Sequence, residues 1–129
     1  MKRLIVDLDN TLTIGETDDY RHATPNLEMI ARLRDYRKMG FEIAIHTSRN
    51  MRSYENSMGK IAARTLPIVT DWLERHGVPY DEIWIGKPWC GREGFYIDDR
   101  AVRPSEFLCL SFEEITDLLA DEVRFAQQR

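Results

Sequence analysis

Two carboxylates follow the first apolar stretch of the chain at a spacing suited to binding a metal ion. Asp7 and Asp9 come directly after residues 4–6, with Leu8 between them. Alternate residues of a strand point to the same side, so both side chains can converge just past the strand's end. Two like charges at one point repel each other unless a cation or proton compensates. Because Mg²⁺ favours one or two carboxylates together with phosphate oxygens, the spacing predicts metal-assisted phosphoryl chemistry.

The same short motif is also compatible with plain turn chemistry, because Asp and Asn cap helices and form Asx-turns after strands. Further polar groups at the ends of other apolar runs favour the metal site. The groups that follow such runs are Thr47, Ser48, Arg49, Lys87, Asp98, Asp99 and Arg100. A hydroxyl with the N–H groups after it suits phosphate oxygens, and a lysine can neutralise both carboxylates and a transferring phosphoryl group. Two acid pairs, a lysine and a hydroxyl at four strand ends favour one active site.

An alternating order of strands and helices has to position these groups. The apolar patterning predicts strands at 3–8, 41–46, 82–86, 95–97 and 107–110, and helices from Thr24–Pro25 to Gly40, over about 58–76, and from Ser111 onward. Thr24 is the expected N-cap and Pro25 the first helical residue, while Pro67 should kink the second helix or begin its second half. Trp72 is expected in the core.

The alternating order of strands and helices predicts an α/β fold with a three-layer, doubly wound parallel sheet of about five strands. Its ligands would lie at the strands' carboxyl ends.

Length and charge limit the classes of protein. The 129 residues predict a single domain over 1–129, and the net charge of −4 argues against nucleic acid as a partner. No apolar run is long enough to span a membrane, and Asp7 interrupts the stretch that would resemble a signal peptide. Cys90 and Cys109 show neither metal-ligand spacing nor a disulfide framework, so we expect free thiols in the cytoplasm.

The order of the polar motifs resembles the four motifs of the haloacid dehalogenase (HAD) superfamily of phosphatases. Residues 7–11 (Asp-Leu-Asp-Asn-Thr) match the first motif, Thr47 the second, Lys87 the third and residues 98–99 (Asp-Asp) the fourth. The match covers nearly the whole chain. The stretches 47–52, 86–91 and 96–107 are more closely similar to the small phosphatases of bacterial capsular polysaccharide biosynthesis loci.

The resemblance implies a catalytic set of Asp7, Asp9, Thr47 and Lys87. Asp7 would attack phosphorus to give an aspartyl-phosphate, and Asp9 would protonate the leaving oxygen and then activate water. The implied Mg²⁺ ligands are Asp7, the backbone carbonyl of Asp9, and Asp99. Residues implied to contact phosphate or substrate, or to orient the groups that do, are Thr11, Ser48, Arg49, Trp89, Asp98 and Arg100.

The short insertions imply a member without a cap domain, whose open site would take a small phosphate ester or be covered by another copy of the chain. The expected function is a Mg²⁺-dependent phosphatase acting on a sugar or polyol phosphate of surface-polysaccharide synthesis. Two alternatives stay open: a nucleic acid 3′-phosphatase, and a receiver-like phospho-acceptor domain. In a receiver, no acid equivalent to Asp9 would be placed to break the aspartyl-phosphate.

Overall fold

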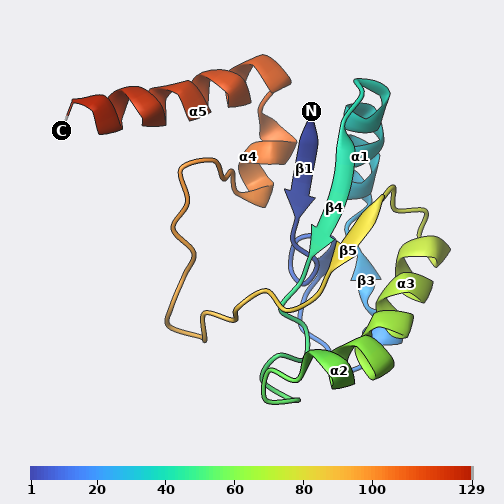
Figure 1. Cartoon of the computed structure of the whole chain (residues 1–129). Helices are drawn as coiled ribbons and strands as arrows, with labels where there is room; N and C mark the ends of the chain where they lie inside the picture. Colours follow the sequence, from blue (N-terminus) through green and yellow to red (C-terminus); the bar gives the residue numbers. More distant parts are fainter. Residues whose placement is uncertain (129) are drawn as a thin grey trace. The chain divides into compact units, whose positions relative to one another are not determined.

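Three parallel strands form the sheet that organises Met1–Trp89, the first of two units in the computed structural model (Figure 1). β1 (Arg3–Val6) pairs with β4 (Glu42–His46), and β4 pairs with β5 (Glu82–Trp84). The three strands run the same way, so their carboxyl ends share one edge of the sheet. The predicted α/β class and the first three predicted strands are therefore confirmed.

One face of this sheet is buried against helices. Val6, Ile43 and Ile45 are buried on that face. They share it because Val6 pairs with Ile45 and because Ile43 and Ile45 are alternate residues of β4. The core also takes apolar residues from α1 (Leu27–Lys38) and α3 (Leu66–Arg75), including Leu33 and Trp72. The indole N–H of Trp72 donates to the carbonyl of Ala23 at 2.9 Å, as a buried indole requires. The expectation that Trp72 is a core residue is confirmed.

The first helix begins later than the sequence pattern predicts. Asn26 is the N-cap of α1, and its side chain accepts a hydrogen bond from the N–H of Met29. Thr24–Pro25 instead form strand β3, which pairs antiparallel with β2 (Thr13–Ile14). A short 3₁₀ helix, η1 (Tyr20–His22), lies between those two strands. The predicted capping role of Thr24 is wrong because Asn26 supplies an equally good cap two residues later.

The second predicted helix is present but contains an irregular turn. It consists of α2 (Met58–Lys60), the π-helical turn η2 (Ile61–Thr65) and α3. Pro67 lies in the first turn of α3, as expected for the start of the second half. Proline has no N–H to donate and its ring crowds the preceding turn, so a wider π turn before it relieves the clash.

The second unit begins at Cys90, and the structure describes residues 1–128 of the chain. This second unit contains α4 (Pro104–Cys109) and α5 (Phe112–Gln127). The predicted capping box at Ser111 is confirmed, because Ser111 and Glu114 exchange bonds at 3.0 and 3.1 Å. Within residues 1–128 no helix is long and apolar enough to cross a membrane.

Two strand predictions in this second unit are wrong. Residues 95–97 form no strand, because a run of three apolar residues is at the lower limit of strand length. Residues 107–110 lie mostly in α4. Pro104 occupies the first turn of that helix, and the Glu106 carboxylate accepts from the Arg103 N–H at 2.8 Å. These starting signals outweigh the strand-like composition of the four residues.

Candidate functional site

A tight turn after β1 holds the first two acids. The carbonyl of Leu8 accepts hydrogen bonds from the N–H groups of Thr11, Leu12 and Thr13, at 3.3, 2.9 and 3.2 Å. Leu8 and Leu12 are fully buried and anchor the turn in the core. Asn10 has a φ of 61°, a left-handed conformation that Asn tolerates better than most residues. The turn therefore keeps its apolar residues inside, while Asp7 and Asp9 remain partly exposed.

Asp7 lies at the meeting point of two strand ends. Its Oδ2 accepts a hydrogen bond from the Thr11 hydroxyl at 3.1 Å, and its Oδ1 lies 3.5 Å from the ammonium of Lys87. Lys87 is 80 positions further along the chain and mostly buried. The side chain of Asp7 is 36% exposed, so its carboxylate is open to solution on the side away from these contacts. The structure thus brings together the first and third predicted motifs.

The backbone fixes Thr47 beside the segment that carries Lys87. The N–H of Thr47 donates to the carbonyl of Trp84 at 3.0 Å, and the N–H of Lys87 donates to the carbonyl of Thr47 at 3.2 Å. These bonds extend the β4–β5 pairing past the ends of both strands. The Thr47 hydroxyl is buried and accepts from the Arg49 N–H at 3.0 Å, and a hydroxyl that accepts one bond can still donate another.

Gly86 sets the direction in which the chain approaches Lys87. Its φ is +86°, and a Cβ there would lie 2.5 Å from the sulfur of Met58. We expect Gly86→Ala to lower the free energy of unfolding by about 1–2 kcal/mol, because a left-handed alanine is strained. Urea denaturation measures this. Gly59→Ala is the matched control, because Gly59 is helical with open space around it and should lose no stability. Equal stabilities for the two variants would contradict the prediction.

Asp9 is held by Arg49 through two hydrogen bonds. Nη2 of Arg49 donates to Oδ1 at 2.7 Å and Nε donates to Oδ2 at 3.2 Å. The Arg49 side chain is only 1% exposed, whereas that of Asp9 is 42% exposed. The guanidinium lies 4.3 Å from the ring centre of Tyr20, in η1. Burial is the largest cause that raises the pKa of Tyr20, and the negative charge of Asp9 raises it further, whereas the charge of Arg49 lowers it. Because the net shift is upward, the Tyr20 phenol stays protonated at neutral pH.

The loop after β4 is anchored at several points. The Thr65 hydroxyl donates to the Asn50 side chain at 2.7 Å, and Met51 is buried. The carbonyl of Ser48 accepts from the N–H of Met51 at 3.0 Å, so Ser48 is part of a turn beside the site. Trp89 is partly exposed, and the guanidinium of Arg52 lies 5.5 Å from its ring centre. Ser48 and Trp89 remain candidates for substrate contact.

His46, at the end of β4, gives the protein a testable pH dependence. Burial and the neighbouring charge of Lys87 lower the pKa of His46 from 6.5, with Asp7 opposing. The unfolded chain therefore binds this proton more readily than the folded chain does. We expect the free energy of unfolding to fall as the pH drops from about 7 through 6.5, until the lowered pKa is passed. In urea denaturation across this range, His46→Gln should lose less stability than the wild type. Parallel pH profiles would contradict the prediction.

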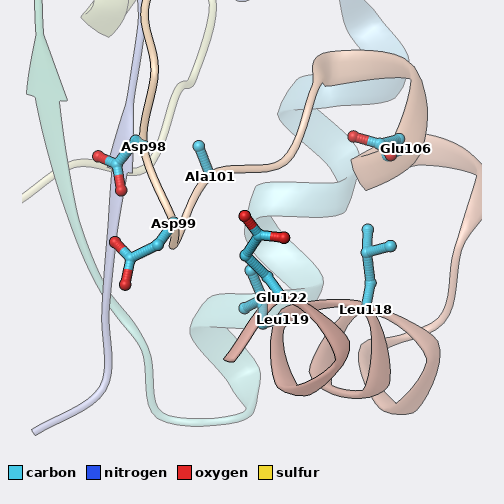
Figure 2. Close-up of a pocket in the computed structure, with 7 residues that line it drawn as sticks. All are labelled: Asp98, Asp99, Ala101, Glu106, Leu118, Leu119 and Glu122. Atoms are coloured by element: carbon cyan, nitrogen blue, oxygen red, sulfur yellow. The ribbon is translucent and has the colours of Figure 1, made fainter. Parts of the chain in front are cut away.

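Asp98 and Asp99 lie in the second unit and line a pocket of about 200 Å³ (Figure 2). Both are exposed, and Oδ1 of Asp98 accepts from the N–H of Arg100 at 2.8 Å. That bond forms an Asx-turn, so Asp98 shows the turn chemistry that is the alternative to a metal site in a short acidic motif. The lining residues are Asp98, Asp99, Ala101, Glu106, Leu118, Leu119 and Glu122. The expected part of Asp99 in metal binding remains a prediction.

Part of the implied magnesium site lies in the first unit. Asp7 provides a partly exposed carboxylate, and the resemblance adds the backbone carbonyl of Asp9, in the same turn. Hard oxygen donors of this kind fit Mg²⁺, which keeps several waters and needs few protein ligands. Within residues 1–128 no group of three or more His, Cys, Asp or Glu side chains is gathered to hold a metal ion. The donors of the first unit thus fit a metal that is also coordinated by water and substrate.

Tyr20 is the residue near the site that the sequence did not suggest. It lies in the segment between β2 and β3, which carries no recognisable motif, and only the fold brings its ring against Arg49. Arg49 itself was expected to be a candidate for contact with an anionic substrate. The structure instead buries it behind Asp9.

Comparison with known proteins finds a similar solved structure. No protein-family model matches the chain, and no curated protein is similar to it. A structural-genomics target from Vibrio cholerae, solved as a crystal structure, is 61% identical with a TM-score of 0.93. The similarity covers 95% of this chain and 99% of the Vibrio cholerae chain. The chain therefore belongs to the same family as this Vibrio cholerae protein.

Proposed function

We propose that this protein is a Mg²⁺-dependent phosphomonoesterase with a capless HAD-like fold, which forms an aspartyl-phosphate on Asp7. The observation that carries the proposal is the 3.5 Å approach of the Lys87 ammonium to Asp7, from another strand end 80 residues away. A lysine beside a partly exposed carboxylate is the arrangement expected when a nucleophile receives an anionic phosphoryl group. The order of the motifs along the chain supports the same interpretation.

The proposed reaction has two steps, and the residues of the site have separate roles in them. A carboxylate oxygen of Asp7 attacks phosphorus, and the bond from phosphorus to the leaving oxygen breaks as Asp9 gives that oxygen a proton. Asp9 then takes a proton from water, whose oxygen attacks phosphorus and releases inorganic phosphate and the Asp7 carboxylate. Lys87 and the Thr47 hydroxyl hold the phosphoryl oxygens in both steps.

In the first unit, Asp7 and the backbone carbonyl of Asp9 would hold the metal, and the resemblance assigns the same role to Asp99. When bound, Mg²⁺ offsets the negative charge of the carboxylate and of the phosphoryl oxygens. The resemblance assigns to Asp98 the orientation of Lys87 or of a ligand of the metal.

The proposed substrate is a small sugar or polyol phosphate of surface-polysaccharide synthesis. This part of the proposal comes from the resemblance of residues 47–52, 86–91 and 96–107 to capsule-locus phosphatases. The segments that follow β1 and β4 in the first unit are too short to form a cap domain, and both acids of the first motif remain partly exposed. Such an open site suits a small ester that diffuses in freely.

Phosphate release from a panel of esters tests the proposal. The panel contains sugar, polyol and nucleotide phosphates and a 3′-phosphorylated oligonucleotide, each with Mg²⁺ and with EDTA. We expect Mg²⁺-dependent release that is fastest for a sugar or polyol phosphate and that returns when Mg²⁺ is added back after EDTA. No release from any ester would contradict the proposal. Preference for the oligonucleotide, with binding that weakens steeply with salt, would favour the nucleic acid alternative.

Labelling with acetyl phosphate separates a phosphatase from a receiver-like domain. A phosphatase should shed the label rapidly, because Asp9 lies two residues from Asp7 and can activate water. A receiver should keep the label for minutes. A long-lived label on the wild type, together with no turnover of any ester, would favour the receiver interpretation.

A further inference from the structure

Arg49 is the most deeply buried charged side chain around the site, and the proposed mechanism gives it no role. Its side chain is 1% exposed, and both carboxylate oxygens of Asp9 accept bonds from it. Nη1 is buried and has no hydrogen-bond partner within the described residues. A buried, unpaired donor costs roughly 1–3 kcal/mol, so this placement needs a reason.

The exposed fractions of the two side chains show which of them faces solvent. Asp9 is 42% exposed, while the arginine that binds it is almost completely hidden. Arg49 therefore supports Asp9 from the protein side and leaves the solvent side of the carboxylate open. Two parallel N–H···O bonds fix the plane of a carboxylate as well as its position. A lysine could not reproduce that geometry.

Tyr20 holds Arg49 in this position. Its ring centre lies 4.3 Å from the guanidinium carbon, within the range of a cation–π contact. Tyr20 belongs to η1, between β2 and β3, so the contact joins this segment to the turn that carries Asp9.

We infer that Arg49, held by Tyr20, is the positioning residue for Asp9 and orients its carboxylate toward the leaving oxygen of the ester. This inference rests on the proposed function. Arg49 acts only through Asp9, so its loss should matter most where protonation of the leaving oxygen matters most. An alkyl or sugar phosphate needs that proton, whereas p-nitrophenyl phosphate has a stable leaving anion and needs it little.

The test compares kcat/KM for these two kinds of ester in the full chain. For Arg49→Met we expect kcat/KM to fall about a hundredfold with an alkyl or sugar phosphate, and less than about fivefold with p-nitrophenyl phosphate. Arg49→Lys should restore part of the loss, because it keeps the charge and one donor. The ratio of the two constants within one sample is independent of how much of the variant is folded.

Two controls and two further test variants complete the experiment. Arg64→Met removes another arginine stacked on a tyrosine, 5.8 Å from the ring centre of Tyr54, and should leave the ratio unchanged. Tyr20→Phe keeps the ring and should also leave it unchanged, whereas Tyr20→Ala should move it in the direction of Arg49→Met. Combined with Asp9→Asn, Arg49→Met should cause no further change in the ratio.

The possible outcomes separate the inference from the proposed function. An equal loss with both esters in Arg49→Met, or no loss, would overturn the positioning role while leaving the phosphatase proposal intact. Failure of the wild type to release phosphate from either ester with Mg²⁺ would overturn the proposed function, and this inference with it.

Discussion

Asp7→Asn should abolish phosphate release, with kcat falling by roughly 10⁴-fold or more, because an amide cannot replace the attacking carboxylate. The fold should survive. Asn keeps the size of the side chain and can still accept the 3.1 Å hydrogen bond from Thr11. Because the Asp7 side chain is 36% exposed, its ion pair with Lys87 should contribute less than about 1 kcal/mol to stability. The measurements are phosphate release in the presence of Mg²⁺ and urea denaturation of the same samples.

Asp35→Asn is the matched control for this variant. Asp35 is an exposed residue of α1, outside the site, so its conversion to Asn should leave turnover unchanged. Substantial turnover by Asp7→Asn would contradict the nucleophilic role. Loss of the folded state in that variant would contradict the exposure and hydrogen bonding described for Asp7.

Lys87→Met should lower kcat by about 10²–10³-fold, the effect typical of removing one donor that stabilises a developing charge. The Lys87 ammonium lies 3.5 Å from the Asp7 carboxylate, where the proposed mechanism places the transferring phosphoryl group. Methionine keeps most of the length of the side chain but has no charge and no N–H. Phosphate release at saturating substrate measures the effect.

Lys38→Met is the control for this change, because Lys38 is an exposed residue in the last turn of α1. It should retain full activity. Activity of Lys87→Met within about threefold of the wild type would show that the ammonium has no part in the reaction, since a lost charge-stabilising donor costs far more.

The part of the site formed by strand ends was predictable from the sequence. Apolar runs followed at once by Asp7, Thr47 and Lys87 predict that these residues share one edge of a parallel sheet. The structure confirms that Asp7 and Lys87 meet there. Parallel strands place all their carboxyl ends on the same side of the sheet, so residues that follow such strands must lie close together. This prediction requires only that each strand is present, and it does not depend on the exact residues at which the strand begins and ends.

The later part of the chain was less predictable. Residues 95–97 and 107–110 have strand-like composition, but short apolar runs do not distinguish a strand from a helix. The Pro104 and Glu106 signals for a helix start were present in the sequence, and they determine α4. The shift of the first helix from Thr24 to Asn26 is a choice between two adequate caps, which local sequence alone cannot decide.

The burial of Arg49 could not be predicted from its neighbours in the sequence. An arginine in a polar loop is ordinarily solvated, and only the fold brings it 40 residues back to Asp9 and against Tyr20. Side chains that act through another residue leave no spacing pattern, because nothing in the chemistry fixes their position along the chain.

Chemical trapping of the phosphorylated residue tests the central claim most directly. Asp9→Asn, which should slow hydrolysis of the intermediate, is mixed with substrate and Mg²⁺, quenched in acid and reduced with borohydride. The protein is then digested with a protease that cleaves after arginine, and the peptide that begins at Leu4, directly after Arg3, is analysed by mass spectrometry. An aspartyl-phosphate is reduced to homoserine, so we expect homoserine in place of Asp7 and at no other residue. Release of phosphate with Asp7 left unmodified, or a modified residue elsewhere in the chain, would contradict nucleophilic attack by Asp7.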